Sequence, residues 1–266
     1  MGFFGRKRAP SVPHPRKEPR FDGPLTLERL EQIFQDCVDF TKRPVSLGEG
    51  GACTLTLCYL SGMVKMERVS DYVLRPLAQD EALARCGTPR QAMEEMMGGA
   101  LYNLSAAERT TLDEAAFDLV AGWCLLFFPG ESAVLSLFVG TEEKRSISSP
   151  SNETVLKGSR DAFVESLRTN TSIVRRHLKA PELRIREQVV GRQSVTSVDI
   201  LYIEGLTNPH LVEQVAAQLA DIDIDAVLAT GNIEEYIVPA ARTAFPLVQY
   251  TERSDRFCAC LLYTSD

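Results

Sequence analysis

Short apolar runs that alternate with helix-period segments constrain the fold of this chain most strongly. Four runs have the apolar content of strands: "CTLTLCYL" (53–60), "WCLLFFPGESAVLSLFVG" (123–140), "LRIREQVV" (183–190) and "VTSVDILYIEG" (195–205). The run at 123–140 is long enough for two strands and predicts a hairpin that turns at residues 129–131. Apolar residues recur at helical spacing in segments that start near Thr26, Met66, Thr88, Leu112 and Asn208. Thr88 is expected to cap its helix, with Pro89 at the first position. The residues expected to face a core are Leu211, Val215 and Leu219 in the last helix and Leu183, Ile185 and Val189 in the strand 183–190. The sequence therefore predicts an α/β fold (α+β, with mixed sheets).

The polar, turn-rich segment that begins at Thr141 predicts a division into two small α/β lobes, 25–140 and 151–257, joined by a short linker at 141–150. The lobes share one pattern. "YLSGMVKMERVSDYV" from Tyr59 and "YIEGLTNPHLVEQVA" from Tyr202 both run strand, Tyr-x-x-Gly turn and helix. Either the lobes are copies of one unit, related by an internal repeat, or this short match arose by chance.

The charge of the chain is unevenly distributed. The net charge is −7, yet residues 1–24 contain six basic and two acidic side chains, which leaves −11 for the remainder. This basic, proline-rich tail is predicted to be disordered, either as a solvated leader or as a polybasic tether to anionic lipid headgroups. Because the body is acidic, nucleic acid is not expected as a partner. Seven scattered cysteines are typical of reduced thiols in a cytosol.

The candidate catalytic and metal motifs are weak. "DIDID" (221–225) has Ala226 and Asn232 where a calcium loop needs glycine and glutamate, so a strand edge or a docking turn is favoured. "GEGGA" (48–52) follows no strand and precedes no helix, which favours an ordinary loop over a phosphate cradle. No nucleophile is paired with a base in a known motif, and no Cys/His pair has ligand spacing. We therefore expect no enzyme activity, no metal and no cofactor.

The segment "KGSRDAFVESLRTNTSIVRRHLK" (157–179) is the most distinctive of the chain. Its periodicity predicts a helix over 161–179, in which Arg168 and Arg175 lie on one face and Asn170 interrupts the middle. One interpretation is a surface helix with solvated arginines. The other is a contact between lobes or subunits, in which arginine forks engage carboxylates or carbonyls.

Several segments resemble the GerA family of spore germination proteins, meaning the A-type subunit of germinant receptors: "SSPSNETVLKGSRDAFVESLRTNTSIVRRHLK", "VGRQSVTSVDILYIEGLTNP", "DIDIDAVLATGNIEEYI" and "FPLVQYTERSD". The resemblance is dense from Pro150 to Asp255 and weaker before Thr141. Three residues depart from the family pattern, Ser159 and Ser254 standing where the family has proline and Ala162 where it has glycine. The closing residues 258–266 do not fit the family, and we expect them to be a non-native end that leaves the second lobe incomplete.

The resemblance implies a cytosol-facing, soluble portion of a protein of the spore inner membrane, continued by membrane helices. It implies a non-enzymatic role in nutrient sensing or signal transmission, with a membrane B-type and a lipoprotein C-type subunit as partners. A homo-oligomer and a small nutrient germinant stay open. The residues expected at a binding or subunit contact are Arg160, Arg168, Asn170, Arg175 and Arg176. Two alternatives remain: an accessory germination ion-channel component that senses no nutrient, and a standalone α/β small-molecule-binding protein or enzyme.

Overall fold

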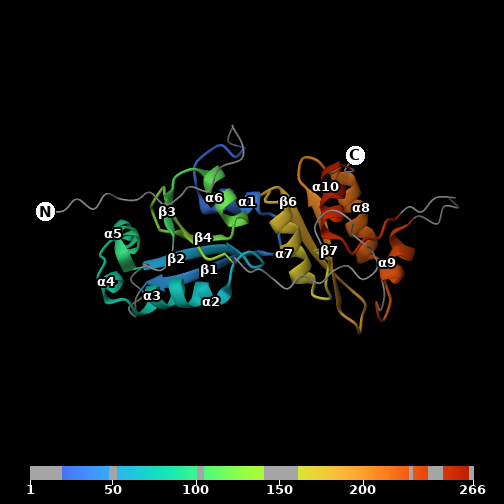
Figure 1. The fold of residues 1–266 in the computed structure, drawn as a ribbon, viewed down its shortest axis with the longest axis horizontal. Coiled ribbons are helices and arrows are strands. Elements are labelled where there is room, and N and C mark those ends of the chain that lie inside the picture. The colour runs from blue at the N-terminus through green and yellow to red at the C-terminus, as the bar shows by residue number, and fades with distance from the viewer. Residues whose placement is uncertain are drawn as a thin grey trace. The chain divides into compact units, whose positions relative to one another are not determined.

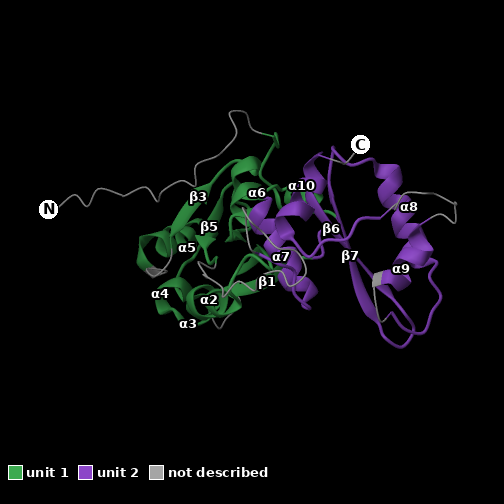
Figure 2. Cartoon of the chain, turned by 45° about the vertical axis from the view of Figure 1, so that its right-hand side comes forward, with its two compact units in different colours: residues 1–35, 39–143, 179–181 green, residues 36–38, 144–178, 182–266 purple. Residues whose placement is uncertain are grey.

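The structure is a computed structural model that describes residues 20–47, 53–100, 105–140, 161–227, 230–238 and 248–263. The chain divides into two compact units (Figure 2). Unit 1 comprises residues 1–35, 39–143 and 179–181, and unit 2 comprises residues 36–38, 144–178 and 182–266. The predicted linker at 141–150, the predicted loop at 48–52 and the tail up to residue 19 lie outside the described residues. Those expectations stay predictions.

Unit 1 is built on an antiparallel sheet with the strand order β1-β2-β4-β5-β3. The strands are β1 (Phe40–Leu47), β2 (Cys53–Leu60), β3 (Ala106–Arg109), β4 (Trp123–Phe127) and β5 (Val134–Phe138). The predicted hairpin is present as β4 and β5, with Trp123 opposite Phe138. The two edge strands, β1 and β3, were not predicted.

Helices cover both faces of this sheet (Figure 1). One face carries α1 (Leu27–Ile33) and α6 (Leu112–Val120), which also pack on each other. The other carries a series of short helices: α2 (Met66–Val69), η1 (Ser70–Leu74), α3 (Arg75–Gln79), α4 (Glu81–Ala84), α5 (Pro89–Glu95) and η2 (Met96–Ala100). Their apolar side chains, among them Val73 and Leu77, are buried against Leu55 and Leu57 of β2. As predicted, Thr88 caps α5 and Pro89 occupies its first turn.

Unit 2 is built on a hairpin of β6 (Leu183–Val190) and β7 (Thr196–Ile203) between two helix pairs. The helices are α7 (Leu167–His177), α8 (Pro209–Ala220), α9 (Thr230–Ile237) and α10 (Ser254–Tyr263). Side chains of α7 and α10 form a core with Leu183 and Ile203, whereas α8 and α9 pack with Val190 from the opposite face. Strands β6 and β7 therefore bury apolar residues on both faces.

The two edges of the hairpin differ. Residues 36–38 run parallel to β6, where Val38 N donates to Ile185 O and Ile185 N donates to Asp36 O. Along the other edge, no strand pairs with β7 among the residues that the structure describes.

The structure corrects three details of the predicted elements. The helix expected over 161–179 begins only at Leu167 and ends at His177. In α8, Leu211 was expected in the core but is 51% exposed, while Val212 is buried. In β6, Val189 was expected to point inward but is 57% exposed, and the neighbouring Val190 is buried instead. Other residues of the predicted faces are buried as expected, namely Leu219 in α8 and Leu183 and Ile185 in β6.

The expected fold class is confirmed as α+β with antiparallel sheets, and the two units share an element order. Helix, strand, strand and helix follow one another as α1-β1-β2-α2 and as α7-β6-β7-α8. The strand registers also match, because Tyr59 and Tyr202 each lie opposite the second residue of the preceding strand, Thr41 and Arg184. This agreement favours an internal repeat over a chance match.

Candidate functional site on helix α7

Helix α7 begins at Leu167, after the N-cap Ser166, because two side chains fix the chain at this point. Ser166 Oγ accepts a hydrogen bond from Thr169 N, as an N-cap does. Asn170 donates from Nδ2 to Val164 O at 2.6 Å and accepts at Oδ1 from Val164 N at 2.8 Å. Asn170 therefore lies in the first turn rather than in the helix middle, and it ties residues 161–166 to that turn.

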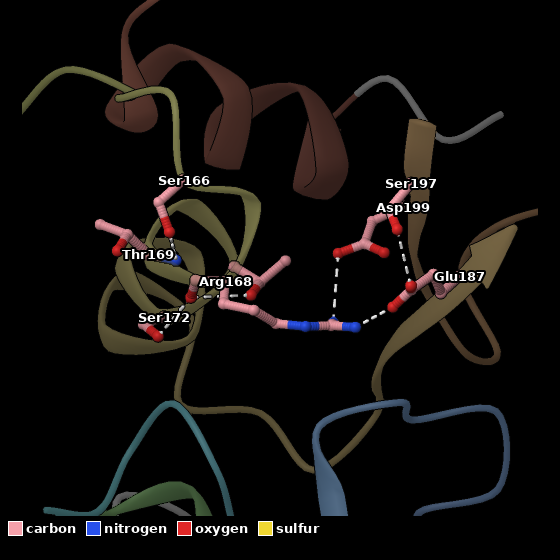
Figure 3. Close-up of polar contacts among 8 residues, drawn as sticks. Ser166, Arg168, Thr169, Ser172, Glu187, Ser197 and Asp199 are labelled. Atoms are coloured by element: carbon pink, nitrogen blue, oxygen red, sulfur yellow. Dashed lines mark hydrogen bonds and ion pairs between the residues drawn. The ribbon is translucent and has the colours of Figure 1, made fainter. Parts of the chain in front are cut away.

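Arg168 connects α7 to both strands of the hairpin (Figure 3). Its guanidinium forms an ion pair with Glu187 of β6 and lies 3.6 Å from the carboxylate of Asp199 on β7. Ser197 Oγ donates to Glu187 at 2.9 Å and orients that carboxylate. The Asp199 side chain is completely buried, whereas the Arg168 side chain is 46% exposed. We call these three ionic residues the Arg168 clamp.

Arg175 lies on the same side of α7 as Arg168, as the seven-residue spacing predicted. It is completely buried and donates from a guanidinium nitrogen to Leu183 O at 3.1 Å. A buried guanidinium needs such acceptors, because a charge without partners is costly inside a protein. Arginine forks do engage carboxylates and a carbonyl here, but the acceptors belong to unit 2 itself.

The remaining candidate residues are less strongly engaged. Arg176 is half-buried near the end of α7, and Arg160 lies outside the described residues. Of the five residues expected at a contact, Arg168 and Arg175 are brought to the strand-facing side of α7, and Asn170 points to Val164 instead. Within the described residues, Arg168 and Arg176 retain exposed surface that a partner can reach.

A Ser-His-Asp cluster that the sequence analysis missed joins the start of α10 to the end of α7. Ser254 Oγ donates to the backbone carbonyl of Asp161 at 3.0 Å and lies 3.2 Å from His177 Nε2. The Asp161 carboxylate is 3.5 Å from the same Nε2 atom. A catalytic triad needs the acid on the opposite ring nitrogen and a hydroxyl whose proton the histidine accepts. Because Ser254 is also fully buried, the cluster is suited to holding α10 against α7.

Other candidate reactive groups are also poorly suited to chemistry. Burial raises the pKa of Cys58 and of Cys124 to about 12, which keeps both thiols protonated and unreactive at neutral pH. No group of three or more His, Cys, Asp or Glu side chains in the described ranges is placed to hold a metal ion. The 221–225 segment docks on the β6–β7 turn, since Arg192 N and Gln193 N donate to Ile224 O and Asp225 O. The docking-turn interpretation is thus confirmed.

The described part of the chain contains no helix that is long and apolar enough to cross a membrane.

The fold and the α7 contacts define a two-unit α+β domain whose charged site joins one helix to a strand hairpin. A family model described as "Bacillus/Clostridium GerA spore germination protein" matches residues 28–263. The chain belongs to this GerA family.

Two curated proteins of Bacillus subtilis are similar to this chain. The uncharacterized membrane protein YfkQ of Bacillus subtilis is 35% identical over 236 residues, which are 89% of this chain and 45% of YfkQ. Spore germination protein KA of the same organism is 32% identical over 226 residues, or 84% of this chain and 40% of that protein. The chain thus spans less than half the length of these curated relatives.

A solved structure shares the fold. The crystal structure of the N-terminal domain of the A subunit of the Bacillus megaterium spore germinant receptor GerK3 matches with a TM-score of 0.67 and 25% identity. The match covers 91% of each chain.

Proposed function

We propose that this chain is the cytosol-facing N-terminal region of a germinant receptor A subunit, which takes part in nutrient sensing and signal transmission and catalyses no reaction. The observation that carries this proposal is the match over 91% of the chain to the N-terminal domain of such a subunit. Ser254 is buried, and burial also raises the pKa of the Cys58 and Cys124 thiols. None of these three nucleophiles is both activated and exposed, which supports a non-enzymatic role.

The proposed setting follows from the family. We expect the complete protein to lie in the spore inner membrane, held there by helices that follow this region, and to assemble with a membrane B-type and a lipoprotein C-type subunit. Helix α7 is the proposed contact element, with the exposed parts of Arg168 and Arg176 at its surface. Asn170 and Arg175 are proposed to support that surface from within, since they bond to Val164 and Leu183 of unit 2.

Deletion of the gene, complemented with the full-length protein, tests the role in germination. Spores without the gene should fail to lose refractility or release dipicolinic acid in response to at least one amino acid or sugar, and the wild-type gene should restore the response. Deleted spores that respond normally to every nutrient tested would contradict the proposal.

A matched pair of variants tests the contact on α7. Arg168→Ala removes both the clamp and the exposed guanidinium, whereas Glu187→Gln weakens the clamp and keeps the arginine. If Arg168 touches a partner subunit, Arg168→Ala should impair germination and co-purification of the subunits more than Glu187→Gln does at equal protein level. Equal effects of the two variants would assign Arg168 to folding alone.

A second candidate is an accessory germination component that senses no nutrient. It is supported by the 31% identity over 202 residues to stage V sporulation protein AF of Bacillus subtilis, a relative named for sporulation and not for germination. Under this alternative, deletion should slow germination by a similar factor for every nutrient. The receptor proposal predicts that only particular nutrients lose their response. A standalone binding protein or enzyme would instead be encoded by a gene without apolar helices after this region.

A further inference from the structure

The turn between β6 and β7 has an exposed valine on either side. Val189 lies on the face of β6 that also carries Glu187 of the Arg168 clamp, because alternate residues of a strand point the same way. Val189 is 57% exposed, and Val195, which directly precedes β7, is 63% exposed. Val195 N donates to Gly191 O and closes the turn between the two valines. We call Val189 and Val195 the tip valines.

Val195 also has an unfavourable backbone conformation. Its φ of 45° lies in the left-handed region, where a β-branched side chain is strained. The side chain gains little burial in return, since most of it is exposed. Glycine or asparagine would adopt this conformation with less strain, yet the turn has an apolar residue here. Backbone strain of this kind is concentrated at functional sites.

Three carboxylates at the end of α8 depart from a second local rule. Helix α8 ends at Ala220 with no basic residue in its last turn, although the negative end of a helix dipole favours basic side chains. Instead Asp221 is the C-cap, and Asp223 and Asp225 follow it, all three being exposed. The segment docks on the hairpin turn, where Gln193 N donates to Asp225 O. Its acidic groups therefore lie next to the turn that carries the tip valines.

The charged side chains at this end of unit 2 do not balance. Arg168 lies between the carboxylates of Glu187 and Asp199, and Arg192 pairs with Asp223. Together with the two other aspartates at the end of α8, these residues comprise five carboxylates and two guanidinium groups, a net charge of −3. A surface of this sign attracts basic groups and repels acidic ones.

We infer that the tip valines and the carboxylates around them form a docking surface for a segment of a partner protein that carries apolar and basic side chains next to each other. The valines supply apolar contact area, and the carboxylates select a cationic partner. The inference rests on the proposed function, because the partner that it describes belongs to the assembly proposed there. Strain at Val195 and acidic groups at a helix C-terminus cost stability in the isolated chain, and both are offset when such a segment binds.

The charge also decides between classes of partner. Anionic lipid headgroups and nucleic acid would be repelled by a surface with a net charge of −3. A basic protein segment with apolar residues meets both requirements of the surface.

One variant separates binding from folding. Val195→Asn relieves the strained backbone and removes the apolar side chain, so it should weaken binding without lowering the stability of the fold. Fluorescence anisotropy at physiological ionic strength measures the binding of a labelled amphipathic peptide of leucine and lysine to the 266-residue chain. Val195→Asn should weaken this binding about tenfold, the effect of losing the burial of one valine side chain. A leucine–glutamate peptide of the same pattern should not bind.

Matched controls separate the surface from overall charge. Leu211→Asn changes an apolar residue that is 51% exposed in the first turn of α8 and should bind the leucine–lysine peptide as the wild type does. Asp225→Asn should weaken binding more than Glu213→Gln, a change of an exposed carboxylate within α8. Equal binding by Val195→Asn and Leu211→Asn would overturn the inference, because the peptide would then be held by overall charge alone. Binding of the leucine–glutamate peptide would overturn it as well.

Three measurements test the other possible occupants. Loss of sedimentation with phosphatidylserine vesicles in Val195→Asn would assign the surface to a membrane. Loss of self-association in the same variant, measured by analytical ultracentrifugation, would assign it to a second copy. Tighter peptide binding after removal of residues 1–19 would assign it to the basic tail of the chain itself. Each of these results would overturn the inference, and none of the readouts involves germination, so a failure here leaves the proposed function standing.

Discussion

Arg168 and Asp199 lie 3.6 Å apart, and of the two side chains the carboxylate is completely buried while the guanidinium is 46% exposed. A residue expected at a contact with a partner is thus also a counter-ion within its own unit. The positive charge of Arg168 offsets part of the free-energy cost of removing the Asp199 carboxylate from water. Any phenotype of an Arg168 variant therefore has a folding component, which stability measurements separate from the rest.

Arg168→Ala should lower the free energy of unfolding by about 1–3 kcal/mol, because a buried acceptor loses a charged neighbour. Urea denaturation followed by circular dichroism measures this loss. The matched control is Arg192→Ala, whose pair with Asp223 is exposed on both sides and should contribute no more than about 1 kcal/mol. Losses of equal size in the two variants would show that the Asp199 contact adds no stability.

Asn170→Ala should cost about 1–3 kcal/mol, since Val164 N and Val164 O both lose a partner in a partly buried position. The Val164 amide should exchange faster with solvent in this variant. The neighbouring Thr169→Ala keeps both bonds and serves as the control. If the Val164 amide exchanged at the same rate in both variants, Asn170 would not be what holds the start of α7.

In unit 1, Asp118→Ala should destabilise the protein by about 3–5 kcal/mol, because it leaves the Arg109 side chain, which is only 11% exposed, without its bidentate carboxylate. Thermal and urea unfolding both report this loss. Glu81→Ala removes an ion pair that is exposed on both sides and should have a small effect. A loss below about 1 kcal/mol for Asp118→Ala would contradict the structural role of the pair.

The same carboxylate should give a pH dependence. Burial raises the pKa of Asp118 above its usual value of 3.8, against the opposing hydrogen bonds from Arg109 and Ser136. A raised pKa in the folded state means that the folded chain binds this proton more tightly than the unfolded chain does. The part of the stability that comes from this protonation is fully present below 3.8 and is lost as the pH rises through the raised value. Unfolding free energies measured from pH 3.5 to 7 should therefore fall for the wild type relative to Asp118→Asn. A difference that stays constant over this range would refute the prediction.

Val195 should be a site of stabilising substitution. This β-branched residue has φ 45° and is 63% exposed, so its left-handed backbone is strained without compensating burial. Val195→Asn should raise the free energy of unfolding by about 1 kcal/mol, because asparagine adopts this region more readily. Val189→Asn, at an exposed position within β6, should show no such gain. A lower melting temperature for Val195→Asn would mean that valine contributes a contact of its own.

Local signals in the sequence were sufficient for many elements. The proline and cap at Asn208 and Pro209 start α8, and the turn at 129–131 joins β4 to β5. Strand β1 was missed because it contains Pro44 and basic residues, which an edge strand tolerates. Strand β3 consists of helix-forming residues, and it becomes a strand through its pairing with β5 and the bond from Arg109 to Asp118. Tertiary pairing overrides local propensity at both edges.

The site was predictable only in part. The seven-residue spacing correctly placed Arg168 and Arg175 on one side of a helix. The acceptors of Arg168 could not be identified, because Glu187 and Asp199 lie 19 and 31 residues further along the chain and spacing carries no information across that distance. The one available signal was Asp199 itself, the only charged residue of β7, which needs a partner once the strand is packed.

The three residues at 36–38 have a practical consequence for work on the isolated parts. They are separated from the rest of unit 2 by more than a hundred positions in the sequence, yet they supply the outer hydrogen bonds of Ile185. A fragment cut at the boundary between the halves would lose these residues and expose the edge of β6, so it should self-associate. Unit 2 is therefore best studied within the whole polypeptide, or with residues 36–38 restored by circular permutation.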